Sequence, residues 1–195
     1  MQRIDLTLPL TNEIFALTES MASTRKNVSK ADLFGHIGTH LDLMGKAYPD
    51  EYFTLCGQVF DVRTVSGRDI EASDIDLDRV GENDFVFFHS GCLAVFGYAS
   101  REYMSSAVQL SWDLIGRLLE KKVAMIGVDF AGVRRQAEHP KADILCADAG
   151  TFVVENVVAL ERLAAEAGSG AFTVHCYPMR LADATGLPCR IIAEV

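Results

Sequence analysis

The stretch His36-Ile37-Gly38-Thr39-His40-Leu41-Asp42 combines two histidines and an aspartate with a residue that has no side chain. His36, Gly38, His40 and Asp42 are spaced by two, so on an extended strand all four would point to the same face. Gly38 would leave room for an ion or a substrate between the two imidazoles. Imidazole nitrogens and a carboxylate oxygen suit Zn²⁺, Mn²⁺ or Fe²⁺. The pattern predicts a metal site to which this row contributes at most three ligands.

The composition is that of an acidic globular protein. With 195 residues, 49% of them hydrophobic, the chain is long enough for one sizeable core and short for two, so we expect a single domain over residues 1–195. The net charge of -9 and the absence of a basic stripe in the sequence argue against a nucleic-acid partner. No apolar run approaches the roughly 18 residues that cross a bilayer, so no membrane partner is expected.

The cysteines predict a reducing compartment. There are five of them, an odd number, and they are widely spread, without a C-x-x-C pair. No secretory signal precedes them. We therefore expect buried, reduced thiols in a cytoplasmic protein.

Hydrophobic periodicity predicts a chain of alternating strands and helices. Short apolar, β-branched runs between turn residues predict strands at 59–65, 84–89, 123–129, 151–154, 171–176 and 190–195. Apolar residues at three- and four-residue spacing predict a helix over 107–122, with Trp112 in the core. A second helix is predicted over 156–167, ending at Gly168. This succession indicates the α/β class, with several strands close enough in sequence to be antiparallel.

Several segments together resemble one known family. The first stretch resembles the signature H-x-G-T-H-x-D-x-P-x-H of the cyclase family, which includes bacterial kynurenine formamidases and isatin hydrolases. Further segments are similar to that family in the same order along nearly the whole chain: Ile4-Asp5-Leu6-Thr7, Asp61-Val62-Arg63, Ile126-Gly127-Val128-Asp129, Gly150 with Val154-Glu155-Asn156-Val157, and Gly186-Leu187-Pro188-Cys189-Arg190. The resemblance implies a swivelling β/β/α-type single domain with a mixed sheet.

The resemblance also implies a site and a reaction. It makes His36, His40 and Asp42 metal ligands and Glu155 a distant carboxylate ligand. It implies one or two divalent cations, Zn or Mn, that activate water for attack on an amide or related carbonyl of a small-molecule substrate. It further implies a homodimer or homotetramer. A bound divalent cation lowers the pKa of its water and polarises a carbonyl, which no side chain here achieves alone.

Lys46 marks one departure from the family pattern. It stands where the signature has its final His, which the family uses as acid/base, and Met44 stands in place of the preceding Pro. An adjacent divalent cation would lower the pKa of Lys46 and allow it to transfer a proton. The alternative is an exposed, solvated ammonium.

A second departure lies twelve residues before Glu155, where the family has its other His ligand. Here that position is Asp143, and a carboxylate in place of an imidazole would favour a harder ion such as Mn²⁺ or Mg²⁺. His139, one helical turn earlier, is the alternative ligand. It ranks second because Pro140 disfavours helix at the residue before it.

These features predict a metal-dependent hydrolase that acts on C–N bonds other than peptide bonds, in an amide or lactam, or on a lactone. The changes at Lys46 and Asp143 argue against kynurenine formamidase activity itself. The alternative is a catalytically inactive protein of the same fold that binds a metal or a small molecule. A purely structural oligomer subunit would leave the coexistence of four residues unexplained: His36, His40, Asp42 and Glu155.

Overall fold

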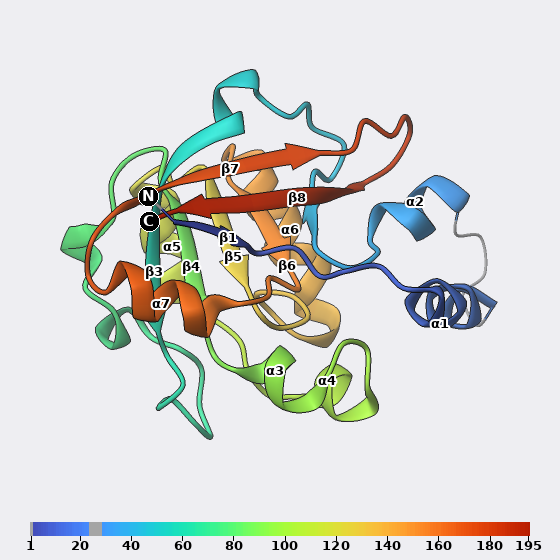
Figure 1. The fold of residues 1–195 in the computed structure, drawn as a ribbon, viewed down its shortest axis with the longest axis horizontal. Coiled ribbons are helices and arrows are strands. Elements are labelled where there is room, and N and C mark those ends of the chain that lie inside the picture. The colour runs from blue at the N-terminus through green and yellow to red at the C-terminus, as the bar shows by residue number, and fades with distance from the viewer. Residues whose placement is uncertain (1, 24–28) are drawn as a thin grey trace.

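The computed structural model describes residues 2–23 and 29–195 and has an α/β architecture built on one mixed sheet (Figure 1). Its strands run in the order β1-β8-β2-β6-β5-β4-β3-β7, and β7 also pairs with β8. That last pairing closes β2 to β8 into a barrel and leaves β1 on the outer edge of β8. The strands are β1 Arg3–Asp5, β2 His40–Asp42, β3 Thr54–Asp61, β4 Phe85–His89, β5 Met125–Val128, β6 Phe152–Glu155, β7 Phe172–Pro178 and β8 Gly186–Glu194.

Helices surround the barrel and extend it at one end. In Figure 1, α1 and α2 stand beside the barrel, while α3 and α4 lie below it. The helices are α1 Asn12–Ser23, α2 Lys30–Gly35, α3 Cys92–Phe96, α4 Arg101–Ser105, α5 Trp112–Glu120, α6 His139–Asp148 and α7 Leu160–Ala167, and a 3-10 turn η4 Gln136–Glu138 precedes α6. Within the described ranges, none of the helices has the length and apolarity needed to span a membrane.

The central strands are parallel and buried on both faces. β3, β4, β5 and β6 pair in parallel, whereas β2, β7 and β8 join the sheet antiparallel. In β4, Phe85 and Phe87 belong to one hydrophobic cluster and Val86 and Phe88 to a second, because successive side chains point to opposite faces. The second cluster includes Leu114 on α5. Such two-sided burial explains the uninterrupted apolar sequence of this strand.

Several predicted boundaries are wrong for identifiable reasons. β3 ends at Asp61 rather than at Val65, because a turn closed by the Val65 N–H and the Val62 carbonyl follows it. α5 begins only at Trp112, because the Ser111 side chain accepts a hydrogen bond from the Leu114 N–H and caps the helix.

The predicted second helix also begins later than the sequence indicated. α7 starts at Leu160, because Asn156 and Ala159 have φ of 59° and 57°, a left-handed conformation that a helix does not continue through. Its predicted end is confirmed at Gly168, whose φ is also 57°.

Helix α6 was not predicted because its apolar residues do not follow one face. Ala142 and Cys146 are buried, but Ile144 and Leu145 are exposed, so the sequence lacks a helical hydrophobic period there. The buried face instead carries the polar residue Asp143. Hydrophobic periodicity therefore does not predict a helix whose buried face carries polar residues of a site.

Two predicted burials are wrong. Trp112 is 38% exposed, and its indole N–H donates to Glu138 while the Arg134 guanidinium lies over its ring. Cys56 is exposed, although the other four cysteines are buried and all five are free thiols.

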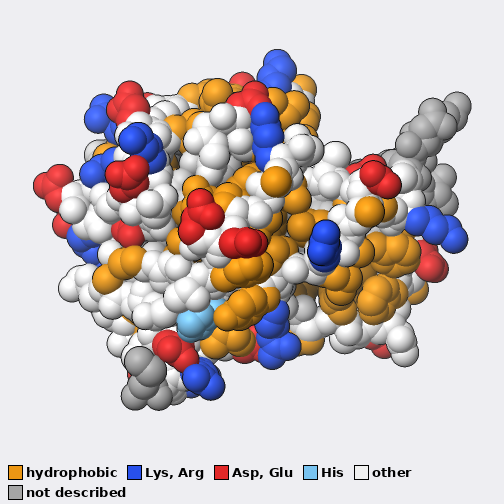
Figure 2. All heavy atoms as spheres, turned by 90° about the horizontal axis from the view of Figure 1, so that it is seen from above, with side chains coloured by type: hydrophobic (Ala, Val, Ile, Leu, Met, Phe, Trp, Pro, Cys, Tyr) orange, Lys and Arg blue, Asp and Glu red, His pale blue; other side chains and the backbone are white. Residues whose placement is uncertain are grey.

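On the face shown in Figure 2, Lys and Arg side chains are scattered among Asp and Glu side chains.

Candidate metal centre

The register between β2 and β6 places the central pair of the site. His40 is the pairing partner of Glu155, and both side chains are buried. His40 Nε2 lies 3.7 Å from Glu155 Oε2 and 3.7 Å from Asp42 Oδ1. Two residues that are 115 positions apart in the sequence are thus brought together by backbone pairing alone.

His36 reaches the same site by a different route from the one predicted. Only His40 to Asp42 form a strand, while His36 caps the end of α2 and Gly38 has φ of 60°. The prediction of one extended row of four residues is therefore wrong. The His36 side chain nevertheless turns toward β2, and its Nδ1 lies 2.9 Å from Asp42 Oδ1.

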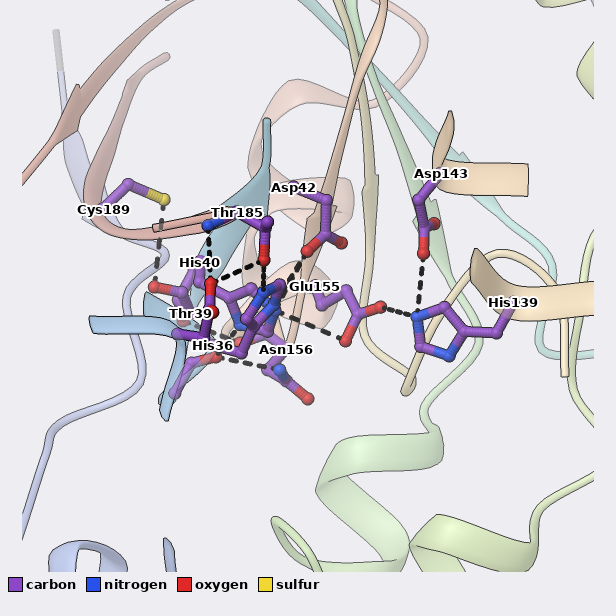
Figure 3. A network of polar contacts seen from close by, with 12 residues as sticks. His36, Thr39, His40, Asp42, His139, Asp143, Glu155, Asn156, Thr185 and Cys189 are labelled. Carbon is purple, nitrogen blue, oxygen red and sulfur yellow. Dashed lines mark hydrogen bonds and ion pairs between the residues drawn. The ribbon is translucent and has the colours of Figure 1, made fainter. Parts of the chain in front are cut away.

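Helix α6 supplies the other side of the site. His139 Nε2 lies 3.2 Å from Asp143 Oδ2 and 2.9 Å from Glu155 Oε1 (Figure 3). Pro140 does not prevent this, because it falls in the first turn of α6, where its missing N–H would have no helical partner. The two residues that the sequence offered as alternatives therefore meet in one cluster, one helical turn apart.

A buried hydrogen-bond network orients His40. Its Nδ1 donates to the Gly38 carbonyl at 2.9 Å, which leaves Nε2 free to face the carboxylates. The same carbonyl accepts from Asn156 Nδ2 at 2.8 Å, and Asn156 Oδ1 accepts from the Tyr103 hydroxyl at 2.5 Å. Sequence reasoning assigned no role to Tyr103 or Asn156; the position of Asn156 directly after Glu155 was the one available signal.

A second network orients His36. Its Nε2 lies 2.9 Å from Thr185 Oγ1, and the Thr185 hydroxyl donates to Asp32 Oδ1 at 2.9 Å. His36 Nδ1 is thereby left to face Asp42. Close packing enforces this position, because a Cβ at Gly186 would lie only 2.6 Å from His36 Cε1. No sequence motif pointed to Thr185, which lies in the loop between β7 and β8.

The electrostatics of the cluster favour an added positive charge. Burial and the neighbouring Asp42 raise the pKa of Asp143 to about 7, although its hydrogen bond with His139 opposes the shift. Burial would lower the pKa of His139, but its hydrogen bonds with Asp143 and Glu155 outweigh burial and raise that pKa to about 11. Neighbouring negative charges contribute to both shifts, because those of Asp42 and Glu155 disfavour a further carboxylate charge on Asp143 and that of Glu155 favours a protonated His139.

The donor set fits a divalent cation. Asp42 Oδ2 and Asp143 Oδ1 are buried without a hydrogen-bond partner, although buried carboxylate oxygens normally have one. Candidate ligand atoms fall into two groups, His36 with His40 and Asp42, and Asp42 with His139 and Asp143. Within each group these atoms all lie within 4.8 Å of one another. Asp42 belongs to both groups, so the geometry accommodates one ion or two adjacent ions.

Lys46 lies away from this cluster. Its Nζ is 2.6 Å from Asp148 Oδ1 at the end of α6, and its side chain is 45% exposed. It is not among the described residues that line the cleft above the site. The geometry favours the exposed-ammonium alternative, and the acid/base role of Lys46 stays a prediction.

The cluster forms the floor of a cleft of about 1260 Å³. The cleft is lined by Tyr98, by α4 with the segment after it, and by η4 with the start of α6. Leu33 and Met44 add apolar surface near the floor. A cleft of this size accommodates a small organic molecule above the cluster.

Comparison with known proteins identifies the family. The family model Cyclase, described as "Putative cyclase", matches residues 4–134, about two thirds of the chain. The chain belongs to the cyclase family. The matched region contains the His36 to Asp42 stretch, while Glu155 and α6 lie beyond it. No curated protein gave a significant match to the sequence.

Solved structures confirm the fold of this cyclase-family chain. One described as "The Structure Of Potential Metal-Dependent Hydrolase With Cyclase Activity" is 21% identical, with a TM-score of 0.74 over 98% of this chain and 96% of that one. Isatin hydrolase A from Labrenzia aggregata, bound to benzyl benzoate, is 17% identical, with a TM-score of 0.72 over 100% and 93%. Isatin hydrolase A from Ralstonia solanacearum is 16% identical, with a TM-score of 0.70 over 98% and 91%. The α/β fold with a mixed sheet, expected from the sequence, is confirmed.

We predict that both α6 residues contribute to cation binding. Replacing His139 by Ala and replacing Asp143 by Ala should each weaken Zn²⁺ or Mn²⁺ binding by at least about tenfold, because each removes a donor that faces the same space. Titration of each ion into the two variants, followed by calorimetry, measures the effect. An affinity that is unchanged in either variant would show that this residue does not reach the ion.

Proposed function

We propose that this protein is a metal-dependent hydrolase that uses water to open an amide, lactam or lactone of a small molecule. The observation that carries the proposal is the buried cluster of imidazoles and carboxylates, with orphaned carboxylate oxygens, on the floor of a cleft. Membership of the cyclase family supports it, as do the hydrolase names of the similar solved structures. Amide and lactam substrates would make it a hydrolase of C–N bonds other than peptide bonds.

Two overlapping sets of residues would hold the cation. His36, His40 and Asp42 form one set, and Asp42, His139 and Asp143 the other, with Glu155 between them. A divalent cation held there supplies Lewis acidity, which polarises a carbonyl oxygen and lowers the pKa of water. Three imidazoles suit Zn²⁺, whereas three carboxylates also suit Mn²⁺, and we propose one of these two ions.

Tyr98 is the residue best placed to contact the substrate oxygen. Its hydroxyl oxygen accepts a hydrogen bond from the Gly38 N–H at 3.0 Å, and Gly38 stands between His36 and His40 in the sequence. Burial and the nearby Glu155 raise its pKa, so the hydroxyl keeps its proton. Among the residues that the structure describes, no acceptor takes that hydrogen. Tyr98 therefore offers a fixed hydrogen-bond donor to a carbonyl oxygen as it gains negative charge.

The second candidate function is binding without catalysis. One observation favours it: Lys46, which stands at the family's acid/base position, points to Asp148 rather than into the cleft. A protein that retains the ligand cluster but lacks a group for proton transfer would still bind a cation and a small molecule. Hydrolysis assays on metal-loaded protein separate the two functions.

We predict that replacing His40 by Ala abolishes both metal binding and hydrolysis. His40 is buried at the centre of the cluster, where its Nε2 lies between Asp42 and Glu155. Elemental analysis of protein purified without chelator, and hydrolysis of aryl formamides, lactams and lactones, measure the two effects. The matched control is His175→Ala, a histidine on β7 that contacts Thr54 and Glu194 outside the cluster. Full metal content in the His40 variant would refute the site, and hydrolysis of none of these substrates by the metal-loaded unaltered protein would favour binding alone.

We predict that replacing Tyr98 by Phe lowers kcat by about 100-fold or more, the usual effect of removing a donor to a developing oxyanion. KM should change little, since the interaction strengthens mainly in the transition state. Metal content should stay the same because Tyr98 is not in either ligand group. A kcat within a factor of three of the unaltered enzyme on its best substrate would contradict this role.

A further inference from the structure

Arg135 carries a positive charge in the wall of the cleft. It precedes η4, four residues before His139, and its guanidinium donates through Nη2 to the Met104 carbonyl on α4. Among the described residues that line the cleft, it is the one Lys or Arg. Arg135 therefore places a positive charge in the lining of the same cleft that the metal-ligand cluster lines.

Arg135 differs from its neighbour in having no carboxylate partner. Arg134 is buried, and its guanidinium donates hydrogen bonds to Asp69 at 2.6 Å, to Glu138 at 2.5 Å and to the Leu110 carbonyl at 2.6 Å. For Arg135 the described residues provide no ion pair, and its Nη1 is buried without a hydrogen-bond partner. An unpaired donor on a charged group is costly to bury, so a missing acceptor is expected there.

The carboxylates of the cleft are already committed to other partners. Asp42, Asp143 and Glu155 belong to the metal-ligand cluster. Asp32 accepts from Thr185 and Ser29, and Glu138 accepts from Arg134. None of these groups neutralises Arg135, so its charge remains available to a molecule that enters the cleft.

We propose that Arg135 binds a carboxylate of the substrate, so that the substrate is an amide, lactam or lactone that also bears a carboxylate. This inference rests on the proposed function. The net charge of -9 repels anions at a distance, so an anionic substrate needs a local cation. A guanidinium matches a carboxylate with two parallel N–H bonds. Apolar side chains of Leu33, Met44 and Met104 suit the hydrocarbon or aromatic part between the two ends.

Binding of benzoate and of its neutral analogue benzamide tests this proposal. Both are titrated by calorimetry into the zinc-loaded protein, into Arg135→Gln, and into the control Arg101→Gln, which removes an exposed charge at the start of α4 outside the cleft. We expect the unaltered protein to prefer benzoate. Arg135→Gln should weaken benzoate binding by at least about tenfold, leave benzamide within twofold, and retain its zinc. Arg101→Gln should change neither, and Arg135→Lys should lie between.

Three results would overturn the proposal: no benzoate binding by the unaltered protein, equal affinity for benzoate in Arg135→Gln, or equal losses for benzoate and benzamide. Equal benzoate affinity in Arg135→Gln would mean that the bound metal ion holds the carboxylate. Equal losses for benzoate and benzamide would mean that Arg135 only stabilises α4 through its hydrogen bond to Met104. Repeating the titration after removal of zinc separates this proposal from the proposed function. A selective loss in Arg135→Gln that persists without metal supports the carboxylate site even if hydrolysis is not found.

Discussion

The antiparallel pairing of β2 with β6 sets His40 opposite Glu155, and the rest of the site is arranged around that buried pair. Three buried carboxylates then lie close together, with α6 adding His139 and Asp143 on one side and the turn after α2 adding His36 on the other. Such a concentration of negative charge is unstable unless cations share the space. The imidazoles of His36 and His139, whose pKa values are raised by the neighbouring carboxylates, supply part of the positive charge. The unpartnered oxygens of Asp42 and Asp143 mark where a metal ion would supply the remainder.

Much of this arrangement follows from the sequence, but its geometry does not. The spacing of His36, His40 and Asp42 predicted that the three side chains lie together, and they do, although a turn rather than a strand places His36 there. The family resemblance supplied Glu155, which no local pattern could have joined to His40, because only the pairing of β2 with β6 does so. The sequence predicts either His139 or Asp143 as a ligand, because Pro140 disfavours helix at the residue before it. In the structure Pro140 lies in the first turn of α6, where it is tolerated, and both residues reach the cluster.

The residues that the sequence could not reveal act through tertiary contacts. Thr185 and Asn156 orient the two histidines from loops far away in the chain, and hydroxyl and amide groups are too common for position alone to single them out. Lys46 shows the converse: it stands at a position of the signature, yet its side chain forms an ion pair with Asp148 at the surface. Tyr98 and Arg135 line the same cleft, so the groups that would recognise a substrate come from segments without a shared motif.

The central claim is that the buried cluster holds a divalent cation. Crystals grown with Zn²⁺ or Mn²⁺ and measured at the absorption edge of the metal test it most directly. The account predicts an anomalous peak about 2.0 to 2.3 Å from His40 Nε2 and from oxygens of Asp42 or Glu155, with a second peak on the His139 side if two ions bind. A fully ordered cluster without a peak, or a peak only at surface carboxylates, would contradict it.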